Sequence, residues 1–475
     1  MGSNRAAGVH RATMPRHKSS SVHGAFNAGQ RARAQGARSR SGSLFPLRGK
    51  NLIALATGIL VVVAAIVVFA ADAAAKHGVG TGHHTGIGTT THSTNSGSGG
   101  GGPAHSAPPG VSPSIGLAPG AVSPSATGLA EARTILPKLT PAQLAGQRVI
   151  YSYSGLTPPA QLLTLIRQGK VAGVIFFTDN ISSESQIAAV DRQLQAANRA
   201  KSNPVRLPLL LMTDQEGGEV RRLPGAPLLS EKQVGEQAHP NDAALNAGKT
   251  GGENLHGVDM NLNLAPVLDV FRQPGNFIDE FGRSFSSDPS VVARLGASYA
   301  KAEQKQGVAA TLKHFPGLGA ATRSQNTDER PVTLNLSLSS IRNVDEAPYK
   351  SAIAAKAKLV MLSWAIYPAL DSKFPAGLSS KIIGGELRNR LKFGGVTITD
   401  ALEAGALNPF GSIAHRATLA ARAGMDLLLC AGSTQKEGVS AANSLAFDYT
   451  HHSLNANAFK ASVERILALR ATLPG

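Results

Sequence analysis

The chain has 475 residues, of which 42% are hydrophobic and 16% are charged. This length and composition allow a sizeable buried core, which excludes a wholly disordered protein. The single cysteine, Cys430, excludes an internal disulfide and a cysteine-based zinc cluster. The net charge of +17 would fit a nucleic-acid-binding protein. However, residues 1–50 hold ten Lys and Arg and no Asp or Glu, so much of the charge lies in one tail and no nucleic-acid partner is expected.

The N-terminal segments are predicted to direct the chain to a membrane. Residues 1–50 lack apolar periodicity and are expected to form a disordered, basic, cytoplasmic tail. Residues 52–71 form an apolar run of the length that spans a bilayer as a helix. Because the positive charges precede this helix, the N-terminus should stay cytoplasmic and the rest should lie outside the cell membrane, as in a single-pass protein. A signal peptide cleaved near Ala71 stays an alternative, although its apolar region would be unusually long.

A linker is predicted to follow the membrane helix. Residues 73–130 are dominated by Gly, Ser, Thr, Pro, His and Ala, a composition typical of a flexible spacer. Its histidines have no fixed spacing and no acidic neighbours, so we expect no metal there. The folded domain is predicted to occupy residues 131–475.

Eight short apolar runs in this domain are predicted to be strands. They are dense in Val, Ile and Leu without clean alternation, which is typical of strands buried on both faces. The runs are Arg148–Tyr153, Val171–Phe177, Leu207–Thr213, Met260–Leu268, Ala309–His314, Leu359–Trp364, Gly395–Thr399 and Met425–Cys430.

Helical patterns alternate with these strands. Examples are Glu184–Ala200, Pro240–His256, Ser290–Gln306 and Ser379–Leu391. This order predicts the α/β class and a single (β/α)8 barrel of the TIM type. A doubly wound sheet is the alternative, but it usually has fewer strands.

Polar residues gather where the predicted strands end. Asp214 follows the third run, Lys313 and His314 end the fifth, and Asp400 follows the seventh. In a parallel barrel the chemistry lies at this end of the strands. Carboxylates that accept and cations that donate hydrogen bonds suit a sugar or another polyol. No phosphate-binding glycine motif is present, and Lys313 beside His314 would repel a cation, so neither a cofactor nor a metal is expected.

Five ordered segments resemble glycoside hydrolase family 3. They are Val171–Phe177, Thr213–Gly218 with Arg222, Gly282–Pro289, Lys313–Gly317 and Gly395–Leu402. The resemblance covers about Pro137 to Ala431 and is greatest to the bacterial β-N-acetylhexosaminidase branch, which acts on cell-wall sugars. It implies retaining hydrolysis of terminal β-N-acetylglucosamine-type glycosides. The membrane topology predicted above would place this activity outside the cytoplasm.

The resemblance also implies roles for individual residues. Asp400 would be the nucleophile, although an Asp at this position could instead cap the following helix. The residues implied to bind the sugar are Asp214, Arg222, Arg283, Lys313 and His314. For these, pairing within the rim is the structural alternative.

The sequence departs from this branch at the general acid. Leu318 stands where the branch has a histidine, and the loop to Pro331 lacks the Asp-Ser-His found there. Asp328 or Glu329 could supply the proton if its pKa were raised, and Asp328 is the acid that we predict. Alternatively both are solvated loop charges. In that case the barrel would be a catalytically impaired module that binds a sugar or a partner.

Two further residues have alternative interpretations. Trp364 could stack on a sugar face or pack in the core. Cys430 is expected to pack in the core. The oligomeric state is left open.

Overall fold

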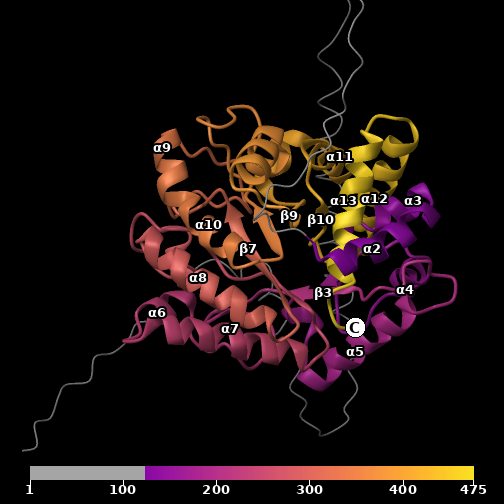
Figure 1. The fold of residues 1–475 in the computed structure, drawn as a ribbon, viewed down its shortest axis with the longest axis horizontal. Helices are drawn as coiled ribbons and strands as arrows, with labels where there is room; N and C mark the ends of the chain where they lie inside the picture. The colour runs from indigo at the N-terminus through magenta and orange to yellow at the C-terminus, as the bar shows by residue number, and fades with distance from the viewer. Residues whose placement is uncertain (1–123) are drawn as a thin grey trace, which may run out of the picture. The chain divides into compact units, whose positions relative to one another are not determined.

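Eight parallel strands form a closed barrel in the computed structural model, which describes residues 124–475 (Figure 1). Around the barrel the strand order is β1-β10-β9-β8-β7-β6-β3-β2. The closed sheet confirms the predicted TIM-type barrel and excludes the doubly wound alternative. The strands are β1 (Val149–Tyr151), β2 (Gly173–Ile175), β3 (Leu210–Thr213), β6 (Leu262–Asn263), β7 (Ala309–Phe315), β8 (Leu359–Leu362), β9 (Val396–Ala401) and β10 (Leu427–Leu429).

Each of these strands falls within or overlaps one predicted apolar run. Most are shorter than the run, because residues beyond the paired segment remain buried without regular pairing. The run Met260–Leu268 shows this most clearly, since only Leu262–Asn263 is strand. A separate hairpin of β4 (Gln215–Gly217) and β5 (Val220–Arg221) follows β3.

Helices cover the outside of the barrel, and the predicted helical patterns are confirmed. α7 (Pro240–His256) matches its prediction, while α5 (Glu184–Asn198) and α8 (Pro289–Gln304) differ from theirs by one or two residues. Local caps set two of these starts: the Ser183 hydroxyl accepts from the Gln186 amide, and Asp288 caps α8 ahead of Pro289. Figure 1 shows α7 and α8 side by side.

The remaining helical elements connect the strands. The α-helices are α3 (Pro141–Gly146), α4 (Ala160–Arg167), α6 (Glu231–Gly235), α9 (Leu338–Ser340), α10 (Ala347–Ala354), α11 (Ile413–Ala423) and α12 (Gln435–Thr450). The shorter or π-helical elements are η2 (Leu136–Lys138), η3 (Thr178–Asn180), η4 (Asp279–Phe281), η5 (Ile341–Asp345), η6 (Ala376–Leu378), η7 (Lys381–Arg390) and η8 (Gly405–Phe410).

The last helix, α13 (Ala456–Arg470), closes one end of the barrel. Ile466, Leu469 and Leu473 belong to the same buried cluster as the apolar residues inside the strands. Arg470 is buried and donates to the carbonyls of Leu207 and Pro208, which precede β3. The C-terminal segment therefore covers the amino ends of the strands and leaves the carboxyl ends for the site.

A helix before the first strand extends the folded domain. α2 (Ala126–Ile135) packs along α13, and the two lie side by side in Figure 1, violet against yellow. The Ser125 hydroxyl caps α2 by accepting from the Gly128 amide. The predicted linker boundary at residue 130 is therefore wrong by a few residues. No regular apolar period marks α2 in the sequence, and its neighbour α13 lies more than 300 residues further along the chain.

The predicted membrane segments cannot be compared with this structure. The tail 1–50, the membrane helix 52–71 and the linker up to residue 123 lie outside the described residues. Within residues 124–475, none of the helices combines the length and apolar character that a membrane span requires. Cys430 is fully buried, which confirms its packing role.

Candidate active site

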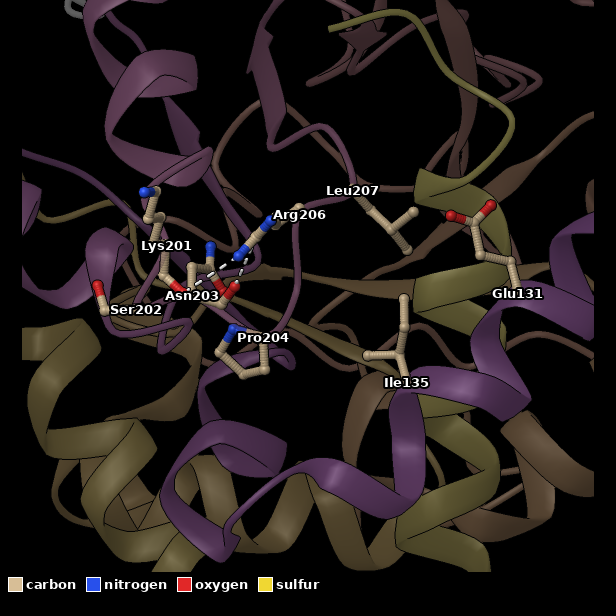
Figure 2. Close-up of a pocket in the computed structure, with 8 residues that line it drawn as sticks. All are labelled: Glu131, Ile135, Lys201, Ser202, Asn203, Pro204, Arg206 and Leu207. Carbon is tan, nitrogen blue, oxygen red and sulfur yellow. Dashed lines mark hydrogen bonds between the residues drawn. The ribbon is translucent and has the colours of Figure 1, made fainter.

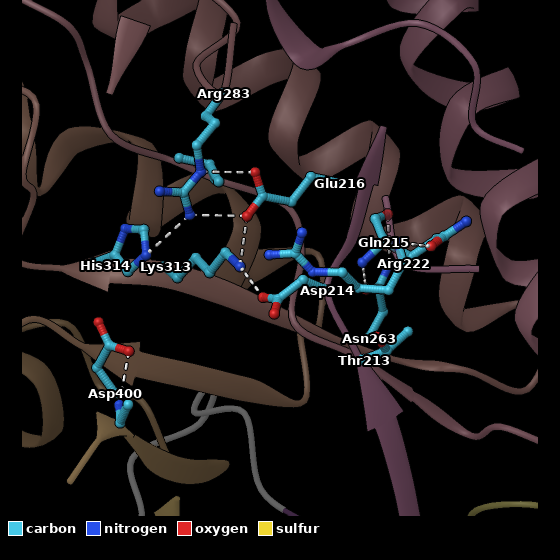
Figure 3. Close-up of polar contacts among 12 residues, drawn as sticks. Thr213, Asp214, Gln215, Glu216, Arg222, Asn263, Arg283, Lys313, His314 and Asp400 are labelled. Atoms are coloured by element: carbon cyan, nitrogen blue, oxygen red, sulfur yellow. Dashed lines mark hydrogen bonds and ion pairs between the residues drawn. The ribbon is translucent and has the colours of Figure 1, made fainter. Parts of the chain in front are cut away.

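The candidate residues meet at the carboxyl ends of the strands (Figure 3). Asp214 follows β3, Lys313 and His314 lie in β7, and Asp400 lies in β9. Parallel strands of one barrel place these ends on the same rim. The predicted gathering of polar residues at one rim is therefore seen in the structure.

Gln215 shapes the segment that carries Arg222. Its amide nitrogen donates to the carbonyls of Leu223 and Ala226, and its oxygen accepts from the Arg222 and Leu223 amides. These bonds fold the β4–β5 hairpin back so that the Arg222 side chain lies beside Asp214 (Figure 3). Among the described residues, Arg222 Nε has no hydrogen-bond partner although it is buried.

Glu216 links two of the predicted binding residues. Arg283 donates to it through Nε and Nη2, both at 2.9 Å, and Lys313 Nζ lies 2.7 Å from Glu216 Oε1 and 2.8 Å from Asp214 Oδ1. Glu216 is only 2% exposed. Glu216 was not among the predicted site residues, although Asp214 and Glu216 are two residues apart and so share one face of an extended segment.

The charges in this cluster keep its carboxylates ionised. Burial alone would raise the pKa of Glu216, but Arg283 and Lys313 outweigh burial and lower it to about 2. Burial also opposes ionisation of Asp214, yet Lys313 and Arg222 lower its pKa. Within residues 124–475, no group of three or more His, Cys, Asp and Glu side chains could hold a metal ion.

Asp269 orients His314. The His314 Nδ1 lies 2.7 Å from Asp269 Oδ2, while Asp269 Oδ1 accepts from the Leu318 amide at 2.7 Å. This network assigns the proton to Nδ1 and leaves Nε2 facing Arg283 Nη2 at 3.4 Å. Asp269 was not among the predicted site residues, because its partner His314 lies 45 residues away in the sequence.

Asp400 is not a helix cap. Its Oδ1 accepts from the Ala401 amide at 2.8 Å, and the side chain is half-buried at the end of β9 (Figure 3). The next α-helix, α11, is capped by Ser412 instead. The capping alternative for Asp400 is therefore excluded, and a partly exposed carboxylate is present at the rim.

Asp328 lies within electrostatic range of Asp400. The residue keeps contact with solvent, but the protein atoms around its carboxyl and the charge of Asp400 raise its pKa to about 6. Arg283 and His314 act on the same carboxyl in the opposite direction. Glu329 instead pairs with Arg330 at 2.9 Å on the exposed side of the loop. Of the two loop carboxylates, Asp328 is the one whose charge couples to the rim.

Trp364 is a core residue. It is 1% exposed, and its Nε1 donates to the Ala401 carbonyl at 2.8 Å. A sugar could not stack on this ring without displacing the residues that cover it. The stacking alternative is therefore wrong. Asp426 is buried between Arg388 and Arg465 and lies before β10, so it is at the opposite end of the barrel from the site.

A surface hollow of about 440 Å³ lies away from this rim (Figure 2). Glu131 and Ile135 of α2 line it together with the segment from Lys201 to Leu207, which precedes β3. It therefore lies at the amino end of the strands and contains none of the candidate residues.

Comparison with known proteins identifies the family. Residues 142–469 match the glycosyl hydrolase family 3 N terminal domain. An uncharacterized secreted glycosyl hydrolase of Arthroderma benhamiae is 46% identical over 69% of this chain and 93% of its own length. A beta-hexosaminidase of Xanthomonas oryzae pv. oryzae is 33% identical over 59% of this chain and 82% of its own.

A solved structure agrees with these matches. The family 3 beta-N-acetylglucosaminidase of Paenibacillus sp. str. FPU-7 superposes with a TM-score of 0.66 at 33% identity, covering 70% of this chain. The matched part spans 63% of that larger chain, slightly less than two thirds. This chain belongs to glycoside hydrolase family 3, and it is a glycoside hydrolase.

Proposed function

We propose that this enzyme is a retaining β-N-acetylhexosaminidase-type glycosidase that removes terminal β-linked N-acetylglucosamine from cell-wall-derived glycans. Asp400 is the nucleophile and Asp328 is the general acid and base. The observation that carries the proposal is the pair of carboxylates at one rim, where Asp400 helps to raise the pKa of Asp328 to about 6. A retaining glycosidase needs one ionised carboxylate and one that can donate a proton.

The two carboxylates divide the chemistry between them. Asp400 attacks the anomeric carbon while Asp328 gives its proton to the leaving oxygen, which yields a glycosyl-enzyme and a free alcohol. Asp328 then removes a proton from water, and the water oxygen displaces Asp400 from the sugar. Proton donation of this kind contributes about 10²–10⁴-fold in rate.

The remaining rim residues would hold the sugar. Arg222 has a free Nε, and Asp214 uses only Oδ1 toward Lys313, so both have hydrogen-bonding capacity left for hydroxyl groups. Arg283, Lys313 and His314 are tied to carboxylates but keep further N–H groups or a ring nitrogen near the same space. We assign all five to substrate binding.

The proposed location is the outer face of the cell membrane. The apolar run 52–71 and the basic segment before it support a single-pass anchor with a cytoplasmic N-terminus. The Arthroderma relative is described as secreted, which is consistent with a catalytic domain outside the cell.

The nucleophile can be tested without the general acid. A dinitrophenyl β-N-acetylglucosaminide has such a good leaving group that it barely needs protonation. We expect the full-length chain to hydrolyse it and Asp400→Asn to lose at least about 10³-fold in kcat/KM. Asp242→Asn, at an exposed position on α7, is the matched control and should keep full activity.

The substrate is tested in the same experiment. A dinitrophenyl β-glucoside, assayed in parallel, should react far more slowly. Faster turnover of the glucoside would overturn the hexosaminidase assignment but keep the nucleophile. No turnover of either sugar by the folded chain would favour a binding module instead.

A further inference from the structure

The loop that carries Asp328 is attached to the segment that follows the strand carrying Asp400. We define the acid loop as residues 318–331. The Gly405 amide donates to the Asp328 carbonyl at 2.8 Å, and the Ala406 amide donates to the Thr327 carbonyl at 3.0 Å. Gly405 and Ala406 begin η8, shortly after Asp400 in the chain. The two segments that carry the proposed catalytic carboxylates are therefore joined by consecutive backbone hydrogen bonds.

The other side of the acid loop is also held. The Gly319 carbonyl accepts from the Arg272 amide at 2.9 Å and from Asn276 Nδ2 at 2.7 Å. Further along, Arg323 pairs with Glu280 of η4. Thr327, next to Asp328, is 1% exposed. The acid loop is thus anchored to neighbouring rim segments on both sides of the site.

Gly405 leaves no space between the two segments. A Cβ atom at this position would overlap the carbonyl group of Glu329 and would lie 2.9 Å from the Arg330 nitrogen. The obstructing atoms are backbone, so they cannot move aside as a flexible side chain would. Any side chain at residue 405 must push the Glu329–Arg330 backbone away from η8.

We infer that Gly405 is a positioning residue, which lets the acid loop dock against the segment after the Asp400 strand and so holds Asp328 in place to protonate the leaving oxygen. This inference rests on the proposed function of Asp328. A displacement of about 1 Å at a catalytic group can lower the rate about 10²-fold.

The test compares two leaving groups in the full-length chain. We expect Gly405→Ala to lower kcat/KM for a methylumbelliferyl β-N-acetylglucosaminide, which has a poorer leaving group and depends more on protonation, by at least about tenfold. Turnover of the dinitrophenyl substrate should change by less than about threefold, since it barely needs the acid. Gly384→Ala on η7 is the matched control, because its new Cβ would meet no atom within 4 Å, and it should leave both rates unchanged.

A double substitution separates positioning from general damage. Gly405→Ala should cause no further loss in an Asp328→Asn background, because the group that it positions is already absent. Equal losses on both substrates, or full additivity with Asp328→Asn, would show that Gly405 acts only on folding or on sugar binding, and this would overturn the inference.

Amide exchange tests the docking independently of activity. In the unsubstituted chain, the Gly405 and Ala406 amides should be protected from hydrogen exchange, and Gly405→Ala should lose this protection. Rapid exchange in the unsubstituted chain would overturn the inference even if the variant does not fold.

If Asp328→Asn does not alter the ratio of the two substrate rates, the acid assignment fails. Retained dinitrophenyl turnover that depends on Asp400 would then still support the proposed nucleophile.

Discussion

At the residue scale, Glu216 is the carboxylate that neutralises and orients two cations of the rim. It is buried and pairs with both Arg283 and Lys313, so its removal would leave two cations short of a partner. Breaking a buried charge pair from one side typically costs 3–5 kcal/mol. We predict that Glu216→Gln lowers the free energy of unfolding by about 3 kcal/mol, as measured by urea denaturation. The same variant should raise KM, because the two cations lose their orientation.

The control for this prediction is Glu219→Gln. Glu219 lies in the exposed turn between β4 and β5, so its loss should change the free energy of unfolding by less than about 0.5 kcal/mol. A Glu216→Gln variant as stable as this control would contradict the charge-pair argument.

The raised pKa of Asp328 predicts the pH dependence. The protein atoms around its carboxyl and the charge of Asp400 raise the pKa of Asp328 to about 6, so Asp328 is protonated at pH 5 and ionised at pH 8. A general acid acts in its protonated form, and kcat/KM for the methylumbelliferyl substrate should therefore fall as pH rises through about 6. The dinitrophenyl substrate should lack this decrease. The measurement is a pH profile of kcat/KM for both substrates.

Substitutions assign the decrease to one carboxyl. Asp328→Asn should remove it, while Glu329→Gln, at the neighbouring loop carboxylate that pairs with Arg330, should keep it. A decrease that persists in Asp328→Asn would belong to another group and would contradict this assignment.

Sequence and structure differ most in how site residues pair. Asp214 and Lys313 could be placed at the rim because each follows or ends a recognisable buried run. The role of Glu216 could not be predicted, since its partners lie 67 residues or more away and only the barrel brings them together. Trp364 was left undecided for the same reason: its burial depends on Gly377, which lies against the ring.

At the element scale, the strands were predictable, but the helix that covers one end of the barrel was not. A strand that is buried on both faces can be recognised in the sequence as a continuous apolar run. The sequence of α13 shows an ordinary helix after the last strand, and nothing local indicates that Ile466, Leu469 and Leu473 enter the barrel cluster. Their position depends on the assembled barrel, whose amino-terminal end this segment covers.

The inserted face of α13 makes a stability prediction. Leu469 packs among the interior residues of the barrel, so truncating it should leave a cavity. We predict that Leu469→Ala lowers the free energy of unfolding by about 3 kcal/mol in urea denaturation. Leu245→Ala on α7 is the matched control, because Leu245 is 38% exposed, and it should cost less than about 1 kcal/mol. Similar losses at the two sites would argue against α13 as the closing element.

At the scale of the whole molecule, the first and the last helix of the described residues are in contact. α2 packs against α13, and α13 in turn closes the barrel, so the segment that precedes the first strand stabilises the molecule through the last helix. Contacts between α2 and α13 are close enough that the Ala468 carbonyl leaves no room for a Cβ at Gly128. The folded unit therefore includes α2, although the composition of residues 73–130 predicted that its first half belongs to the linker.

A truncation tests whether α2 belongs to the folded unit. A chain that begins at residue 131 loses the Ser125 cap and half of α2, whereas a chain that begins at residue 124 keeps both. We predict that the shorter chain has a free energy of unfolding lower by about 2 kcal/mol, since loss of a cap alone costs about 1 kcal/mol and helix contacts are lost as well. Urea denaturation measures the difference. Arg133→Ala in the longer chain removes only the exposed pair with Glu464 and should cost less than about 0.5 kcal/mol. Equal stability of the two truncated chains would show that α2 contributes nothing to the barrel, and the domain would then begin where the apolar pattern begins.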